Sequence, residues 1–262
     1  LSSFAGADPA LNAMLLRAAR LAETRVPLVL EGETGTGKER LARAVHVCGP
    51  ADRALHVVRC ACVTAAQITE HADAPAGTIF LKGLEDLGAA EQAALLALLE
   101  RREDLRPVAS CRRDLARAVR EGAFRADLYF RIAGDTLRLP PLRLRHDLDW
   151  LIDRVLRRHN ARGLSLSPAA RADLGGRDWP GNIRELESVI DVAAAVAEGK
   201  VIDLPDLPAP CLSEQPTPGG GDDLEALLDA CGWNMARVAK RLGVNRSTIL
   251  RRVRKAGLSA PG

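Results

Sequence analysis

The sequence predicts an α/β domain built on a parallel sheet, then a small helical domain and, after a linker, a helix-turn-helix. Three observations lead to this prediction. Short apolar runs alternate with helix-forming segments as far as Pro140-Pro141, the pattern is helical only from Asp147 onward, and a proline- and glycine-rich stretch precedes a basic C-terminal end. Strands that alternate with helices form mostly parallel sheets covered on both faces. The predicted parts are residues 1–141, 142–204, a linker at 205–221, and residues 222–262.

The first elements are an amphipathic helix at residues 8–23, with Pro9 after Asp8 at its start, and a strand at 26–30. A glycine-rich turn at residues 32–38, Gly-Glu-Thr-Gly-Thr-Gly-Lys, leads from this strand into a helix at 39–46. Such a turn lets backbone N–H groups surround phosphate oxygens at a helix N-terminus, where Lys38 adds a positive charge. The turn is therefore predicted to be a P-loop, which binds a nucleotide.

The remaining elements follow from the same patterns. Further strands are predicted at residues 55–58, 78–81, 106–110 and 136–139, and helices at 89–101 and 114–121, with a charged segment to Arg131. In the second domain, helices are predicted at 148–159, 167–174 and 183–197, the last one capped by Asn182. Three short helices near 224–230, 235–242 and 246–255 give the spacing of a helix-turn-helix.

The charge of the chain is unevenly distributed. The net charge is +3, but the residues from Ala230 onward hold eight Lys or Arg and no acid, which leaves −5 for the other 229 residues. A compact basic end predicts binding to double-stranded DNA, by a dimer on a two-fold site. Asn245 caps the last predicted helix, whose first turn would meet base edges, while later arginines would meet phosphates. The predicted DNA-binding residues are Asn245, Arg246, Ser247, Thr248, Arg251, Arg252 and Arg254.

No metal site is predicted. The histidines and cysteines closest in sequence match no common zinc spacing, so buried, reduced thiols are expected; these residues are His46, Cys48, His56, Cys60, Cys62 and His71. The six cysteines of the chain follow no disulfide framework pattern, so the reducing cytoplasm is the expected compartment. No apolar run is long enough to span a bilayer and no signal peptide is seen, so no membrane partner is expected. A first residue other than Met, Leu1, suggests a piece of a longer chain.

Several motifs point to one family. The first motif is the glycine-rich turn together with the Glu that follows it, at residues 32–39. The others are Phe-Arg-Ala-Asp-Leu-Tyr-Phe-Arg at 124–131, Leu-Pro-Pro-Leu-Arg at 139–143 and Trp-Pro-Gly-Asn-Ile-Arg-Glu-Leu at 179–186. Together they resemble the AAA+ domains of bacterial enhancer-binding proteins that activate sigma-54 RNA polymerase, namely their Walker A motif, arginine-finger segment, the stretch after it, and sensor II motif. Residues 243–248 resemble the recognition turn of the Fis-type DNA-binding domain that these regulators carry.

The chain also departs from this family. The stretch at 78–84, Thr-Ile-Phe-Leu-Lys-Gly-Leu, lacks both Walker B acids, one for Mg²⁺ and one for the attacking water. Only sixteen residues separate Cys60 from Gly77, without the loop that grips the sigma factor. Arg59 and Arg112 fall where the family has asparagines. A three- or four-residue shift would carry the nearest acids, Glu85 and Asp86, past the strand end.

The resemblance and the departures together predict nucleotide binding without hydrolysis. ATP or ADP is the expected cofactor, and Lys82 either neutralises phosphate charge in place of Mg²⁺ or turns outward to solvent. The resemblance implies that Arg125 and Arg131 are arginine fingers acting across a subunit boundary in a dimer or ring, although surface arginines that only pack remain an alternative. The predicted nucleotide-binding residues are Gly32, Glu33, Thr34, Gly35, Thr36, Gly37, Lys38, Glu39, Lys82 and Arg184.

The function predicted is that of a sequence-specific, DNA-binding transcriptional regulator that does not remodel sigma-54 polymerase. It would act with RNA polymerase carrying the main sigma factor, or as a repressor. Two alternatives stay open: an active ATPase that uses Glu85 or Asp86, and a DNA-binding oligomer whose P-loop is empty. The family usually places a sensing domain before this module.

Overall fold

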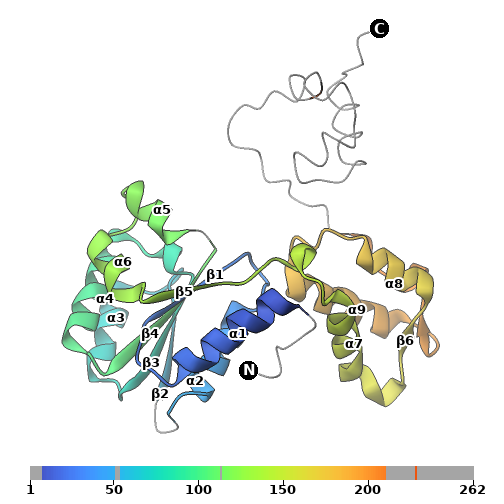
Figure 1. Ribbon diagram of the computed structural model, residues 1–262, viewed down its shortest axis with the longest axis horizontal. Helices are drawn as coiled ribbons and strands as arrows, with labels where there is room; N and C mark the ends of the chain where they lie inside the picture. The colour runs from blue at the N-terminus through green and yellow to red at the C-terminus, as the bar shows by residue number, and fades with distance from the viewer. Residues whose placement is uncertain (1–7, 51–53, 113, 211–227, 229–262) are drawn as a thin grey trace. The chain divides into compact units, whose positions relative to one another are not determined.

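The computed structural model describes residues 8–50, 54–112, 114–210 and 228 (Figure 1). The chain divides into two units, Leu1–Ser213 and Glu214–Gly262. The predicted helix-turn-helix and its DNA-binding residues, from Asn245 to Arg254, lie outside the described residues. The domain boundaries predicted from the sequence stay predictions.

A five-stranded parallel sheet forms the centre of the first unit. Its strands are β1 (Leu28–Glu31), β2 (Ala54–Arg59), β3 (Gly77–Lys82), β4 (Leu105–Cys111) and β5 (Asp135–Arg138), in the order β2-β3-β4-β1-β5. In register, Leu28 of β1 lies between Val108 of β4 and Asp135 of β5. All five strands predicted from the sequence are confirmed, and the parallel arrangement brings their carboxyl ends to one edge.

Helices cover both faces of the sheet (Figure 1). One face packs on α1 (Pro9–Ala22) and α2 (Lys38–Val47), the other on α3 (Ala65–Thr69), α4 (Ala89–Arg101) and α6 (Ala126–Ile132), and α5 (Leu115–Arg120) lies next to α6. Because successive strand residues face opposite sides, Leu28 and Leu30 join the first core while Val29 joins the second. The helix α3 was not predicted from the sequence, and the segment that forms α6 was predicted only as a charged segment.

The helical domain consists of α7 (Leu148–Leu156), the 3₁₀ helix η5 (Arg157–Arg162), α8 (Pro168–Gly175) and α9 (Asn182–Val196), packed around the buried Trp179. The three predicted helices are confirmed, but the expectation of helices alone is wrong. Two short strands, β6 (Ser165–Leu166) and β7 (Val201–Ile202), pair in parallel. Strands of two residues carry no periodic pattern, so only the tertiary contact reveals them.

Asn182 does not cap α9, which corrects another prediction. The capping position is Gly181, and Asn182 lies in the first turn of the helix, fully buried, with φ of +53°. Its side-chain oxygen accepts a hydrogen bond from Leu142 N at 2.7 Å, and its side-chain nitrogen donates to Thr34 O at 2.9 Å. Asn182 therefore joins the P-loop to the start of the helical domain, and its amide is not available to the helix end.

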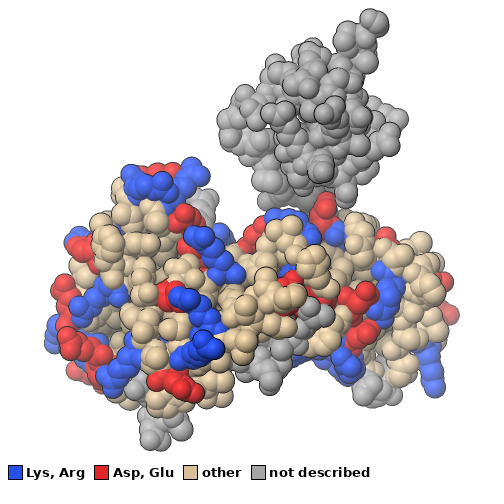
Figure 2. All heavy atoms as spheres, viewed as in Figure 1, with Lys and Arg blue, Asp and Glu red and all other residues tan. Residues whose placement is uncertain are grey.

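None of the helices within the described residues is both long and apolar enough to cross a membrane. On the face shown in Figure 2, Lys and Arg are interspersed with Asp and Glu, and many of these charges are paired, such as Arg17 with Asp135 at 2.6 Å. The prediction of DNA binding therefore depends on the basic C-terminal residues.

Candidate nucleotide-binding site

The P-loop has the backbone that its glycines predict. It connects β1 to α2, and Gly35 and Gly37 have φ of +81° and +101°. A Cβ on Gly35 would lie 2.0 Å from the carbonyl oxygen of Gly181. Ile183 N also donates to Gly35 O at 3.0 Å. Only glycine fits here, because the turn before α9 rests directly on the loop.

Lys38 is held by the loop itself. Its Nζ donates to Gly32 O at 2.5 Å and to Glu33 O at 2.7 Å. Thr36 Oγ1 also donates to Glu33 O, at 2.8 Å. Burial lowers the pKa of Lys38, an effect that the nearby Glu85 charge opposes. A desolvated ammonium at a helix N-terminus gains strongly from a phosphate anion, so the arrangement suits a phosphate ligand.

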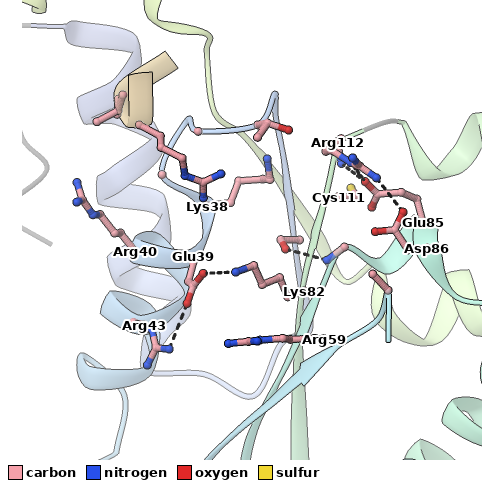
Figure 3. A pocket seen from close by; sticks show the side chains of 18 of the residues that line it. Lys38, Glu39, Arg40, Arg43, Arg59, Lys82, Glu85, Asp86, Cys111 and Arg112 are labelled. Atoms are coloured by element: carbon pink, nitrogen blue, oxygen red, sulfur yellow. Dashed lines mark hydrogen bonds and ion pairs between the residues drawn. The ribbon is translucent and has the colours of Figure 1, made fainter. Parts of the chain in front are cut away.

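A cavity of about 570 Å³ lies between the P-loop, the carboxyl ends of β2, β3 and β4, and α9 (Figure 3). Ligands of open parallel sheets bind at this edge. The cavity brings together most of the predicted nucleotide-binding residues, namely Thr34, Gly35, Gly37, Lys38, Glu39, Lys82 and Arg184. Gly32, Glu33 and Thr36 shape the loop through the bonds described above.

Lys82 ends β3 and points across the cavity to the P-loop helix (Figure 3). Its Nζ donates to Glu39 Oε2 at 2.6 Å, and Arg43 donates to the other oxygen of Glu39 at 3.2 Å. The Lys82 hydrogen bond is the main cause of a lowered pKa for Glu39. Two cations thus neutralise the one carboxylate at the start of α2.

Glu85 and Asp86 also face this cavity. They lie beyond the end of β3, as predicted, but Gly83 with φ of +75° turns the chain back, so that both acids line the cavity. Arg112 donates from Nε to Glu85 Oε1 at 2.7 Å and from its terminal nitrogen to Asp86 Oδ1 at 2.8 Å. Glu85 Oε2 is buried and receives no hydrogen bond from any described residue. The side chain of Arg112 thus holds both carboxylates.

The two arginines predicted as fingers contact their own chain. Arg125 donates to Asp127 at 2.7 and 3.1 Å from the start of α6. Arg131 donates to Leu99 O at 2.9 Å. Neither is among the residues that line the cavity, and their action across a subunit boundary stays a prediction.

Sequence reasoning missed several residues of the cavity. Arg40, Arg43 and Glu187 line it together with Arg59 and Arg112. Arg40 and Arg43 are three residues apart on α2, just after Lys38, and this helical spacing was the signal available. Glu187 follows the sensor II segment by one residue, but a pattern in one helix does not show which element it will meet.

Four cysteines fall within the described residues. Burial raises the pKa of Cys60 and of Cys111 to about 12, so these are the inert, buried thiols expected from the sequence. Cys48 and Cys62 are exposed, against that expectation. Over the described part of the chain, no group of three His, Cys, Asp or Glu is placed to hold a metal ion.

Comparisons with known proteins agree with this geometry. Residues 5–142 match the sigma-54 interaction domain, residues 143–223 the AAA+ ATPase lid domain, and residues 224–255 the bacterial regulatory protein, Fis family. The fold class predicted from the sequence, an AAA+ P-loop domain with a lid and a helix-turn-helix, is confirmed.

Individual relatives are longer than this chain. The acetoin catabolism regulatory protein of Cupriavidus necator is 34% identical over 319 residues, covering 100% of this chain and 48% of that protein. The transcriptional regulatory protein ZraR of Salmonella typhimurium is 32% identical over 294 residues, covering 94% and 67%. NtrX from Brucella abortus, solved in complex with ADP, shares the fold with a TM-score of 0.69 at 23% identity. The match covers 97% of this chain and 68% of the NtrX chain, and the structure of NtrX with ATP matches with a TM-score of 0.68. The chain thus spans about half the length of the first relative and two thirds of the second.

Proposed function

Because the chain belongs to the family defined by the sigma-54 interaction domain, followed here by an AAA+ lid and a Fis-type helix-turn-helix, we propose that it is a sequence-specific, DNA-binding transcriptional regulator. Its AAA+ module binds ATP or ADP and does not hydrolyse it. The observation that carries this proposal is the cavity beside the P-loop, in which Lys82 is paired with Glu39 and Arg112 with Glu85 and Asp86.

Nucleotide binding rests on the phosphate-binding turn and the desolvated Lys38. NtrX, which has the same fold, was solved with ADP and with ATP. Mg²⁺ in such sites needs oxygen ligands from the residue after the P-loop lysine and from the strand end. Here Glu39 is neutralised by Lys82 and Arg43, and the strand end is itself a lysine. These residues do not fit a Mg²⁺ ion, so nucleotide binding is expected to be independent of Mg²⁺.

Loss of hydrolysis follows from the same contacts. Cleavage needs a group that orients or polarises the attacking water. Glu85 and Asp86 are the cavity acids that follow the end of β3, and Arg112 pairs with both. A slow ATPase is a second candidate function, favoured by one observation: Glu85 Oε2 lies beside the cavity without a hydrogen-bond donor among the described residues.

The connection from β2 to β3 supports a regulator that does not contact sigma-54. It forms α3 and the short 3₁₀ helix η2 (Glu70–Asp73). Arg102, at the C-terminal end of α4, holds this connection in place by donating hydrogen bonds to His71 O at 3.2 Å and to Ala74 O at 2.7 Å. Nothing in this segment projects as a long loop. The alignment to the acetoin regulator covers 319 residues against 262 in this chain, which leaves at least 57 positions opposite gaps here.

Self-assembly is part of the proposal. Phe130 on α6 is 79% exposed beside Arg131, and an exposed aromatic side chain of this size is typical of a protein interface. A nucleotide bound at such an interface would join subunits without being hydrolysed. A DNA-binding oligomer with an empty P-loop is the third candidate, distinguished from the others by nucleotide binding alone.

Calorimetry with ATP and ADP tests the proposal, with and without Mg²⁺, followed by a phosphate-release assay on the same sample. We expect nucleotide to bind with equal affinity in both buffers and no phosphate to be released. Lys38→Ala is the control variant that is expected to abolish nucleotide binding. A Lys82→Asp variant is expected to bind nucleotide more tightly with Mg²⁺ than without. Release at an ordinary ATPase rate would contradict the proposal, and no binding would leave only the DNA-binding function.

DNA binding is tested separately, on the full chain. Arg246→Ala is expected to relax sequence specificity, whereas Arg252→Ala is expected to weaken binding to all sequences alike and to reduce its salt dependence. Equal effects of the two variants on specificity would contradict the assigned roles.

A further inference from the structure

A second cavity, of about 360 Å³, adjoins the first. Gly37, Arg40, Arg43, Ile183 and Glu187 line both, so the two cavities meet at the P-loop helix and the first turns of α9. A ligand that reaches from the phosphate-binding turn into the second cavity would pass the ion pair of Arg40 and Glu187.

Part of the second cavity is apolar. Leu11, Met14 and Leu15 of α1 face Trp150 and Leu151 of α7 across it. Apolar and aromatic walls next to a phosphate site suit a flat heterocyclic base. The sugar of a bound nucleotide then lies between this apolar part and the P-loop, where Arg40 belongs to both linings.

The cavity also has more positive charge than a plain nucleotide needs. Five arginines line it with a single acid, Glu187; they are Arg40, Arg43, Arg145, Arg154 and Arg158. Arg40 donates to both oxygens of Glu187 at 2.7 and 3.0 Å, and Arg158 shares one of them at 2.8 Å. One carboxylate thus serves two guanidinium groups.

Arg154 is the arginine without an acid. Its guanidinium lies 5.1 Å from the centre of the Trp150 ring, and no carboxylate among the described residues pairs with it. Burial, together with the charges of Arg158 and Arg40, lowers the pKa of Arg154. The other two arginines of the lining are compensated, because Arg43 is bonded to Glu39 and the buried Arg145 to Asp147.

We propose that this nucleotide site prefers, over ATP and ADP, a nucleotide phosphorylated on its ribose as well as at the 5′ position, with Arg154 and Arg158 binding the ribose phosphate. The proposal rests on the proposed nucleotide binding and deepens it. ATP and ADP carry all their phosphates at the 5′ end, where the P-loop binds them, and their sugar is uncharged. A phosphate on the 2′ or 3′ oxygen supplies the anion that Arg154 lacks, and it competes with Glu187 for Arg158. Guanidinium groups bind phosphate well, because their N–H groups can donate two parallel hydrogen bonds to its oxygens.

Calorimetry on the full chain with matched ligands tests this inference. ADP is compared with ADP that carries an additional phosphate on its 3′ oxygen, and with the 2′ isomer, in one buffer. At least one ribose-phosphorylated ligand is expected to bind about tenfold more tightly than ADP, as charge-assisted hydrogen bonds to a partly buried arginine predict.

Variants identify the residues responsible. Arg154→Gln is expected to bring the affinity ratio between the ribose-phosphorylated ligand and ADP close to one, and Arg158→Gln to reduce it. Arg157→Gln is the matched control, since this neighbouring arginine is exposed and outside the lining, and it is expected to keep the ratio. Melting curves show that each variant is folded.

The outcomes separate this inference from the function on which it rests. Binding of ADP with no preference for a ribose phosphate overturns the inference and leaves the proposed function standing. A preference that survives in Arg154→Gln also overturns it. No binding of any of the three nucleotides overturns both.

Discussion

Replacing Arg112 by alanine is expected to destabilise the protein, because this side chain neutralises two carboxylates. Glu85 would keep only the hydrogen bond from the backbone nitrogen of residue 112, at 2.9 Å. Its side chain is only 9% exposed, so water cannot replace the lost guanidinium. Asp86, whose side chain is 33% exposed, would be partly rehydrated.

The size of the effect follows from these exposures. A hydrogen bond between charged groups contributes roughly 1.5–3 kcal/mol when it is shielded from water. The side chain of Arg112 is 54% exposed, so screening reduces the two bonds together to about 2 kcal/mol. For a folded unit of this size, each kcal/mol shifts the melting temperature by about 2–4 °C, which gives a decrease of about 4–8 °C.

Thermal unfolding of the purified chain measures this shift. Arg117→Ala is the matched control: it removes an ion pair of the same 2.7 Å length with Glu121, but both side chains are exposed, and no measurable shift is expected. Adding Glu85→Gln to Arg112→Ala is expected to restore part of the loss, since a neutral amide is cheaper to bury. If Arg112→Ala melts within a degree of Arg117→Ala, Arg112 does not hold the two acids, and the reason given for lost hydrolysis fails.

Three further predictions follow from contacts around the site. Gly35→Ala is expected to abolish nucleotide binding and to lower the melting temperature, because its Cβ would lie 2.0 Å from Gly181 O at a φ of +81°; unchanged calorimetry would contradict the close packing of the loop. The hydrogen bond from Arg143 lowers the pKa of Glu33 below 4.5, so the stability that this pair contributes is full above that value and is lost as the pH falls through the lowered pKa. Urea unfolding of wild type and Arg143→Ala should therefore differ at neutral pH and converge as the pH falls through the lowered pKa of Glu33, and a constant difference would refute this. Arg102→Ala is expected to expose the β2–β3 connection to proteases, and wild-type cleavage kinetics would argue against its fixing role.

Much of the fold could be predicted from local patterns. The five strands and the helices α1, α2 and α4 are long or regular enough for apolar spacing to define them, and the phosphate-binding turn is defined by its glycines. The missed elements are short. The helix α6 has seven residues, and β6 and β7 consist of two residues each, so their signal is a contact with a segment distant in sequence.

For the candidate site, the sequence by itself determined which residue types are present: the P-loop with Lys38, a lysine at the end of β3, and an arginine at position 112. Only the tertiary structure decided what they do to each other. The turn at Gly83 brings Glu85 back to the cavity, where Arg112 pairs with it, and the docking of α9 on the P-loop buries Asn182. The reason is physical: hydrogen bonds and charge pairs depend on distance in space, and these partners are separated by 27 and by 148 positions in the chain.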